Sequence, residues 1–151
     1  MRALVGVLHS DRETERLAPQ PGLAQVQRLA EQTRASGLAV QVRIEGPRRT
    51  LPEAVDLTAY RIVQEALTNT LKHAGATRAD VIVRFAEDDL ELLVTDDGAG
   101  GSNGAMLPGT GRGLVGMRER VALFHGTLHV GTLPGGGFQV HAHIPTAELG
   151  A

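Results

Sequence analysis

The sequence predicts an α+β fold, a two-layer α/β sandwich in which helices cover one face of a mixed β-sheet. Its 151 residues, 42% of them apolar, suffice for one domain with a hydrophobic core. Helix and strand patterns follow one another in the order helix, strand, helix, hairpin, loop, helix, hairpin. Because amphipathic helices bury their apolar side against a second layer, we expect the strands to form that layer as a sheet.

The N-terminal part starts with a short amphipathic segment, residues 1–9, and a polar stretch that ends in Pro-Gln-Pro-Gly at 19–22. Apolar residues then recur at helical spacing over 23–35, and Gly37 ends this predicted helix. The next segment, 38–46, alternates and is rich in β-branched residues, which predicts a strand.

The middle of the chain predicts a second helix and a β-hairpin. The helix begins at Asp56, whose side chain can cap it, and runs to about Ala74, where Gly75 closes it. Two alternating segments, 80–86 and 90–96, are joined by three acidic residues and form the hairpin.

The C-terminal part begins with a glycine-rich stretch, residues 97–113, which contains seven glycines and no periodicity. We expect it to be a long, mobile loop. A last helix is predicted over 113–125, followed by strands at 127–132 and 137–144 that a Pro-Gly-Gly-Gly turn separates.

Composition argues against several classes of protein. A formal net charge of −2 and 3% aromatic residues disfavour a nucleic-acid-binding protein, which usually has a basic patch. The absence of cysteine excludes disulfides and thiolate metal sites. No apolar run approaches the roughly 20 residues that span a bilayer, and residues 1–9 lack the apolar core of a signal peptide. We therefore expect a cytoplasmic domain.

The polar side of the second predicted helix carries Glu65, Asn69, Lys72 and His73, at positions i, i+4, i+7 and i+8. The core-facing half is predicted to hold Ala59, Tyr60, Val63, Ala66, Leu67, Leu71 and Ala74. From the helix alone, an ordinary solvated face is an equally good explanation of the polar stripe. Asparagine is unfavourable inside a helix, however, so Asn69 needs a partner outside it. A carboxylate and an amide oxygen one turn apart suit magnesium, and a nearby lysine suits phosphate.

A second motif lies where a predicted strand ends at Asp96 and is followed by Gly98 and Gly100. A buried carboxylate at a strand end can accept a hydrogen bond from an exocyclic amine such as that of adenine. The glycines would let the backbone approach the flat base closely. In isolation, an ordinary Asp-Gly turn is the more frequent reason for such a pattern.

A third motif contains Gly111, Gly113 and Gly116, which match the dinucleotide-binding fingerprint by letter. No strand precedes them, and glycines stand where that fingerprint needs an acidic residue. No Gly-Lys-Ser/Thr is present, which excludes a P-loop. What remains is a glycine-rich loop that leads into a helix N-terminus, whose free N–H groups suit phosphate.

Four histidines, His125, His129, His141 and His143, are not predicted to form a metal site. His141 and His143 are two residues apart and share one strand face, but no carboxylate stands at matching spacing in the sequence. Single histidines in strands are most often surface or packing residues.

The three motifs, in this order and spacing, resemble the N, G1 and G2 boxes of the GHKL ATPase superfamily, and specifically the catalytic ATP-binding domain of sensor histidine kinases. The phrases YRIVQEALTNTLKHAGA, VTDDGAG and GRGLVGMRERV are most similar to the NarL/DesK-type subfamily. The resemblance covers residues 20–146. It implies ATP and Mg²⁺ as cofactors and a two-layer α/β sandwich, in agreement with the predicted order of elements.

The resemblance also implies a role for each site residue. Glu65 would polarise the attacking group or a metal-bound water, and Asn69 would bind magnesium. The other implied contacts are Lys72 and His73 at the phosphates, Asp96, Gly98 and Gly100 at adenine, and Gly111, Gly113 and Leu114 at the end of the ATP lid and the start of the last helix.

The chain departs from the family pattern in two places. Family members often have a threonine near the adenine aspartate, whereas here Phe138 follows Gly137. Family members also phosphorylate a histidine on a preceding helical hairpin, and no matching segment occurs in this sequence. Because residues 1–9 resemble the tail of the second hairpin helix, we expect the chain to be a fragment of a longer kinase.

The function implied by the resemblance is to bind ATP-Mg and to position the γ-phosphate for transfer to a histidine on the hairpin of the same kinase. A response regulator would act downstream, and the parent protein would be a homodimer, with or without a membrane anchor. We expect the fragment itself to be monomeric and not to bind nucleic acid. Two alternatives stay open: an anti-sigma-type serine kinase of the same fold, and a nucleotide-sensing or docking module without transfer activity.

Overall fold

The computed structural model describes residues 20–72, 75–98 and 110–146 of the chain. The predicted tail at 1–9, the site residues His73 and Gly100, and most of the predicted glycine-rich loop lie outside the described residues. The expectation that this loop is mobile therefore stays a prediction.

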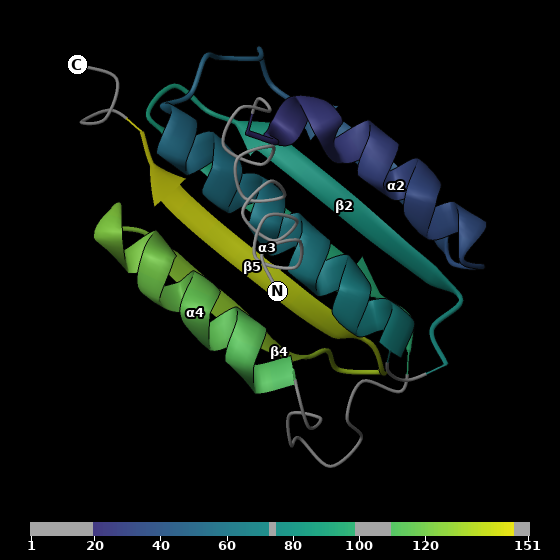
Figure 1. Cartoon of the computed structure of the whole chain (residues 1–151). Coiled ribbons are helices and arrows are strands. Elements are labelled where there is room, and N and C mark those ends of the chain that lie inside the picture. Colours follow the sequence, from purple (N-terminus) through teal and green to yellow (C-terminus); the bar gives the residue numbers. More distant parts are fainter. Residues whose placement is uncertain (1–19, 73–74, 99–109, 147–151) are drawn as a thin grey trace, which may run out of the picture.

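One mixed sheet forms one layer of the molecule, and helices of the described residues cover one of its faces (Figure 1). The strand order is β1-β2-β3-β5-β4, in which β1 is parallel to β2 and the other pairs are antiparallel. The elements are η1 (Leu23–Gln25), α2 (Val26–Ala35), β1 (Ala39–Glu45), α3 (Glu53–Lys72), β2 (Arg78–Phe85), β3 (Asp89–Asp96), α4 (Thr110–Leu123), β4 (Thr127–Thr132) and β5 (Phe138–Pro145). The parallel pair is possible because α3 crosses over between β1 and β2. The α+β sandwich predicted from the sequence is confirmed.

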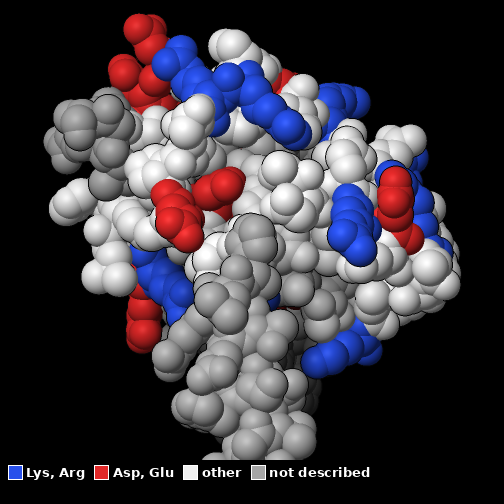
Figure 2. All heavy atoms as spheres, turned by 45° about the horizontal axis from the view of Figure 1, so that its top comes forward, with Lys and Arg blue, Asp and Glu red and all other residues white. Residues whose placement is uncertain are grey.

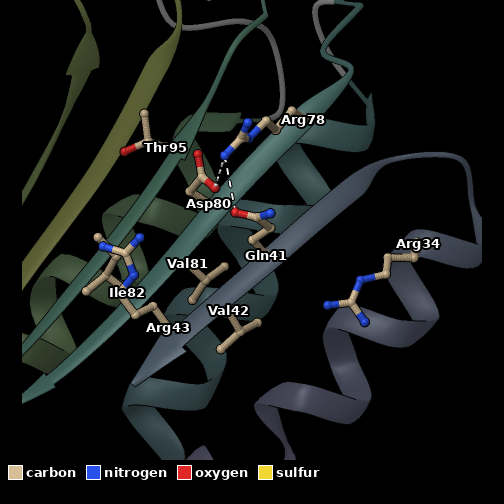
Figure 3. Close-up of a pocket in the computed structure, with 9 residues that line it drawn as sticks. All are labelled: Arg34, Gln41, Val42, Arg43, Arg78, Asp80, Val81, Ile82 and Thr95. Atoms are coloured by element: carbon tan, nitrogen blue, oxygen red, sulfur yellow. Dashed lines mark hydrogen bonds and ion pairs between the residues drawn. The ribbon is translucent and has the colours of Figure 1, made fainter. Parts of the chain in front are cut away.

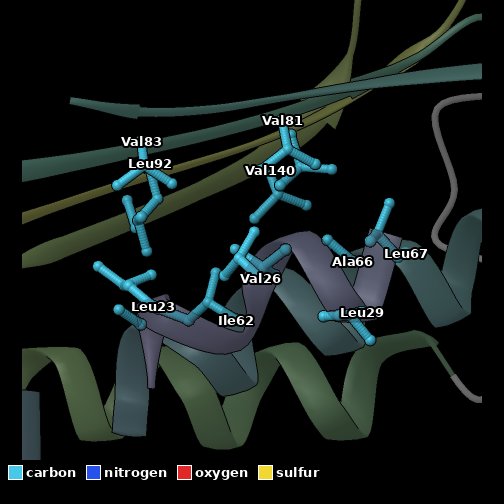
Figure 4. Packing of buried hydrophobic residues seen from close by; sticks show 14 of the residues in the cluster. Leu23, Val26, Leu29, Ile62, Ala66, Leu67, Val81, Val83, Leu92 and Val140 are labelled. Carbon is cyan, nitrogen blue, oxygen red and sulfur yellow. The ribbon is translucent and has the colours of Figure 1, made fainter. Parts of the chain in front are cut away.

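The hydrophobic core lies between the helices and the covered face of the sheet (Figure 4). From the helical layer, Val26 and Ile62 point toward the strands, and from the sheet Val81, Leu92 and Val140 point back toward them. The strands supply these residues at alternate positions, since successive side chains of a strand face opposite sides of the sheet.

The helix α3 packs its inner face so tightly that its rotation about its own axis is set. Ile62, Val63 and Leu67 are all buried, with at most 1% of their surface exposed. The prediction that Leu71 faces the core is wrong, because this side chain is 43% exposed. Leu71 follows the buried Ala66 by five residues, which is about 140° around a helix with about 100° per residue.

The helix α3 also begins earlier than predicted, at Glu53, so Asp56 is not its cap. The Asp56 carboxylate instead accepts a hydrogen bond from the backbone N–H of Leu23, with 2.8 Å between Oδ1 and N. This bond satisfies a free N–H at the start of η1, which leads directly into α2. Gly22 lies so close to the same carboxylate that a Cβ there would overlap it.

The helix α4 begins at Thr110, three residues before the predicted start at Gly113, and ends at Leu123. Its end is marked by His125, which has a positive φ of 63°. The N–H groups of His125 and Gly126 donate to the carbonyls of Ala122 and Val121, respectively. This pair of bonds is the Schellman pattern that closes many helices, here with histidine in the position that glycine usually takes.

The face of the sheet opposite the helices carries ion pairs and hydrogen bonds between neighbouring strands. Arg84 pairs with Glu45 and Glu91, and His141 Nε2 lies 2.9 Å from Glu91 Oε2. The hydrogen bond to His141 and the charge of Arg84 hold the pKa of Glu91 below its usual range. His143 likewise lies 3.0 Å from a carboxylate oxygen of the adjacent strand. The sequence spacing could not reveal these carboxylates, because they come from β3, which the fold places beside β5.

Acidic and basic side chains are interspersed on the face that Figure 2 shows, with neither sign forming a broad area. Among the described residues, no helix has the length and apolar character needed to cross a membrane.

We predict that Asp56→Ala destabilises the protein by about 1 kcal/mol, because the N–H of Leu23 loses its partner at a helix start. Asp56→Asn keeps an oxygen acceptor and should lose less. Urea denaturation followed by circular dichroism measures both. Equal losses for the two variants would contradict this role for the carboxylate.

Candidate functional site

The elements that carry the described site residues meet at one end of the sandwich, where the C-terminal half of α3, the end of β3 and the start of α4 lie together (Figure 1). The helix α3 contacts both α4 and β3. Its flank toward α4 carries the polar stripe noted in the sequence, and its inner face reaches the end of β3. The motif on α3 is thus in direct contact with the elements that carry the other two motifs.

Glu65 lies against the backbone of α4 at Gly113. A Cβ on Gly113 would overlap the Oε1 atom of Glu65, so only glycine lets the carboxylate lie in this position. The sequence motifs that contain these two residues are far apart along the chain, yet α3 and α4 bring them into contact. The Glu65 carboxylate is half-buried between α3 and α4, so it is held in place and still partly accessible to a ligand.

Asn69, one turn after Glu65, is 6% exposed. Its Nδ2 atom is buried and has no hydrogen-bond partner within the described residues. An unsatisfied buried amide costs about 1–3 kcal/mol, so a group that pairs with it on binding recovers that loss. The oxygen and nitrogen of an amide have nearly the same shape, so the side chain can present either atom.

The residues present are compatible with Mg²⁺ bound mainly through phosphate and water. Within the described ranges, no three His, Cys, Asp or Glu side chains are grouped so that they could hold a metal ion. Mg²⁺ usually keeps several waters and takes one or two protein ligands together with substrate phosphates. The Asn69 amide, with the Glu65 carboxylate one turn away, is a donor set of that kind.

Asp96 ends β3 on the covered side of the sheet and is 8% exposed. Its Oδ1 accepts a hydrogen bond from the N–H of Gly98 at 2.9 Å. Its Oδ2 lies 2.9 Å from the hydroxyl of Thr70 on α3. Thr70 was not among the site residues predicted from the sequence, although its position four residues after the core-facing Ala66 indicates that it faces the sheet.

Phe138, at the start of β5, and Gly137, just before it, lie beside Asp96. Phe138 is the direct ladder partner of Asp96, so the phenyl side chain stands at the position noted as a departure from the family. Gly137 has φ of 100°, and a Cβ there would overlap the Asp96 carbonyl oxygen. Glycine is required at 137 for both reasons.

The other predicted site residues have diverse surroundings. Lys72 is exposed at the end of α3, and Gly98 is buried beside Asp96. Gly111 and Leu114 lie in the first turns of α4, and the Leu114 side chain belongs to the core. Because α4 begins at Thr110, the free N–H groups of its first turn come from residues before Gly113, not from Gly113 and Leu114.

Asp97, directly after Asp96, has a different environment and role. Its carboxylate accepts hydrogen bonds from the Thr77 hydroxyl at 2.6 Å and from the N–H groups of Thr77 and Arg78 at 2.8 and 2.9 Å. The Thr77 hydroxyl, followed by the two N–H groups, lowers the pKa of the Asp97 carboxyl to about 2. Asp97 therefore ties the end of β3 to the start of β2.

A separate hollow of about 620 Å³ lies over the β1 and β2 edge of the sheet (Figure 3). Its lining residues are Arg34, Gln41, Val42, Arg43, Arg78, Asp80, Val81, Ile82 and Thr95. Arg78 Nη2 lies 3.2 Å from both Gln41 Oε1 and Asp80 Oδ1 within it. None of the predicted site residues lines this hollow, so it is distinct from the site between α3, β3 and α4.

Comparisons with known proteins identify relatives of the chain. Residues 54–148 match the model of a family described as histidine kinase-, DNA gyrase B-, and HSP90-like ATPases. The chain is 34% identical over 110 residues to the signal transduction histidine-protein kinase/phosphatase DegS of Brevibacillus brevis, covering 73% of this chain and 28% of that protein. It is 31% identical over 112 residues to the oxygen sensor histidine kinase NreB of Staphylococcus carnosus, covering 74% of this chain and 32% of that protein.

The chain is also similar to a solved structure of a histidine kinase domain. The histidine kinase domain of the Erythrobacter litoralis EL346 blue-light activated histidine kinase superposes with a TM-score of 0.60 at 27% identity, over 83% of this chain and 65% of that one. The chain spans less than a third of the length of the two curated relatives.

We predict that Asp97 contributes to stability above its unfolded pKa of about 3.8, and that this contribution is lost as the pH falls toward about 2. The sign follows because the folded protein binds this proton more weakly than the unfolded chain does. Denaturant midpoints of wild type and Asp97→Asn, measured from pH 2 to pH 6, should differ most at the upper end and converge at the lower end. A difference that stays constant across this range would contradict the prediction.

We also predict that Gly113→Ala displaces the Glu65 carboxylate but leaves the fold intact, because the overlapping atom is the end of a flexible side chain. The unfolding free energy should stay within about 1 kcal/mol of wild type, since alanine is the better helix former. Gly116→Ala is the matched control in the same helix, because a Cβ there meets no atom within 4 Å. NMR shifts of Glu65 should change in the first variant only, and unchanged shifts in both would count against the contact.

Proposed function

Because the chain belongs to the family of histidine kinase-, DNA gyrase B-, and HSP90-like ATPases, we propose that it binds ATP with Mg²⁺ and positions the γ-phosphate for transfer to a histidine. Residues 20–146 form the ATP-binding domain in this proposal. The acceptor histidine lies on a helical hairpin of the same kinase, which is a homodimer, and a response regulator receives the phosphoryl group. The domain acts in the cytoplasm.

The observation that carries this proposal is that α3 reaches both halves of the site at once. Its flank holds Glu65 against α4 at Gly113, with Asn69 one turn further along, and its inner face holds Thr70 against Asp96. A nucleotide also has two halves, a base and a phosphate chain, that must be held at a set separation. A rigid helix between the two subsites provides that separation without ordering cost on binding.

Asp96 is the base-recognition group in the proposal. As an ionised carboxylate it only accepts hydrogen bonds, and it therefore pairs with the 6-amino group of adenine but repels the 6-oxo group of guanine. The buried Gly98 and the neighbouring Gly100 allow the base to approach the backbone.

The phosphate half is formed by Asn69, Lys72 and His73 together with the first turn of α4, which includes Gly111. Gly113 leaves room for Glu65, and Leu114 packs the start of the helix into the core. Asn69 would hold Mg²⁺, which when bound neutralises charge on the phosphates. Lys72 meets phosphate as a flexible point charge, and the helix start attracts anions through its free N–H groups.

Glu65 is the catalytic residue in this proposal, and it orients the attacking histidine or a water. In the transfer, the bond between the γ-phosphorus and the bridging oxygen breaks, a bond to the histidine nitrogen forms, and ADP leaves. Positioning and charge neutralisation supply most of the rate in such reactions.

We predict that the domain binds ATP in preference to GTP and that Asp96→Asn lowers ATP affinity about 10- to 100-fold, as expected for losing a charged hydrogen-bond acceptor. Asn69→Ala should reduce the affinity measured with Mg²⁺ to that measured without it. Isothermal calorimetry with ATP and GTP, with and without Mg²⁺, gives all of these values.

The transfer step needs a second measurement with the histidine-bearing hairpin of the parent kinase and radiolabelled ATP. Acid-labile phosphohistidine should form with wild type and disappear with Glu65→Gln. Equal binding of ATP and GTP by wild type would refute the base-recognition role of Asp96. Normal ATP binding without any phosphohistidine would leave a nucleotide-binding domain that does not transfer phosphate.

A further inference from the structure

Thr70 is a buried polar side chain in the last turns of α3, one residue after Asn69. Its hydroxyl oxygen lies 2.9 Å from Asp96 Oδ2 and 3.0 Å from the carbonyl oxygen of Ala66. Within the part of the chain that the structure describes, it is the one side chain that donates to Asp96. We propose that Thr70 is a positioning residue, which holds the Asp96 carboxylate in the orientation that recognises adenine; this inference rests on the proposed function.

The hydroxyl of Thr70 has one proton for two acceptors. The Ala66 carbonyl already receives the backbone N–H of Thr70 in the regular helical pattern, so it does not need the hydroxyl as well. A hydrogen bond to a carboxylate is charge-assisted and stronger than one to a neutral carbonyl. If the proton pointed to Ala66, the lone pairs of the hydroxyl would also face the negative Oδ2 at 2.9 Å. The proton therefore lies mainly on the line to Asp96.

The carboxylate of Asp96 is held at both of its oxygens. The Gly98 N–H binds Oδ1 and the Thr70 hydroxyl binds Oδ2, and two fixed donors define the plane of the group. A carboxylate has about four acceptor positions, so about two remain for an incoming amine. Without Thr70, the carboxylate would keep a donor only at Oδ1 and could rotate about its Cβ–Cγ bond. The free acceptor position would then be spread over several directions.

A purely structural explanation accounts for only part of this geometry. Buried threonines in helices often bond the carbonyl four residues earlier, which explains the contact with Ala66. It does not explain why the hydroxyl also meets a carboxylate on another element at 2.9 Å. Phe138, the ladder neighbour of Asp96, has no hydroxyl to offer from the strand side. The helix therefore supplies the donor that β5 lacks.

The test compares ATP and GTP affinities by calorimetry for wild type, Thr70→Val and Thr70→Ser. Thr70→Val replaces the hydroxyl by a methyl group of nearly the same size, and Thr70→Ser keeps the hydroxyl. We expect Thr70→Val to lose about tenfold in ATP affinity with little change for GTP, because one charge-assisted hydrogen bond orients the base acceptor. Thr70→Ser should stay within about twofold of wild type. The ratio of the two affinities is the decisive reading, since a general loss of structure lowers both alike.

The outcomes separate this inference from the function on which it rests. If wild type prefers ATP and Thr70→Val has the same ratio of ATP affinity to GTP affinity, the role of Thr70 is overturned and the proposed function stands. Wild type that does not bind ATP would overturn both. Thermal unfolding shows whether each variant is folded, and Thr70→Ala removes the same hydroxyl if the valine variant is not. A parallel loss of ATP and GTP affinity in folded variants would also overturn the inference.

Discussion

The burial of one face of α3 against the sheet determines where the other sides of this helix can lie. Ile62, Val63 and Leu67 are almost completely withdrawn from water, and each such side chain contributes about 1.5–3 kcal/mol. A helix packed in this way cannot turn about its axis without exposing them. Its remaining sides are therefore assigned as well: Glu65 must face the start of α4, and Thr70 must face the end of β3. The geometry of the site follows from the packing of the core.

The two consecutive aspartates at the end of β3 show how one residue type takes two roles. Successive residues of a strand face opposite sides, so Asp96 points into the covered layer and Asp97 does not. Asp97 is occupied by three donors from the start of β2 and serves as a tie between strands. Asp96 has one donor at each oxygen and keeps acceptor capacity for a ligand. The number and direction of the donors, more than burial alone, distinguish the structural carboxylate of Asp97 from Asp96, the proposed recognition group.

The two faces of the sheet differ in what they contribute to the stability of the protein. The covered face supplies the apolar core, whereas the open face carries exposed ion pairs such as the one between Arg84 and Glu45, which contribute little to stability. The hollow over β1 and β2 also belongs to the edge and the open face and shares no residue with the proposed nucleotide site. The contact between Glu65 and Gly113 lies next to the glycine-rich segment that precedes α4 in sequence. Any shift of the start of α4 would therefore change the surroundings of Glu65.

The fold class, the order of the elements and most residues of the proposed site could be predicted from the sequence alone, because amphipathic periodicity and the glycine, asparagine and aspartate motifs are local patterns. The sequence could not determine how far α3 is rotated, so Leu71 was wrongly assigned to the core and Thr70 was overlooked. It also missed that Asp56 reaches Leu23 and that β3 places carboxylates beside His141 and His143. Each of these contacts joins residues at least 26 positions apart. These contacts depend on the folded arrangement, because the pairing of strands and the packing of a helix on a sheet bring together side chains whose proximity no local spacing encodes.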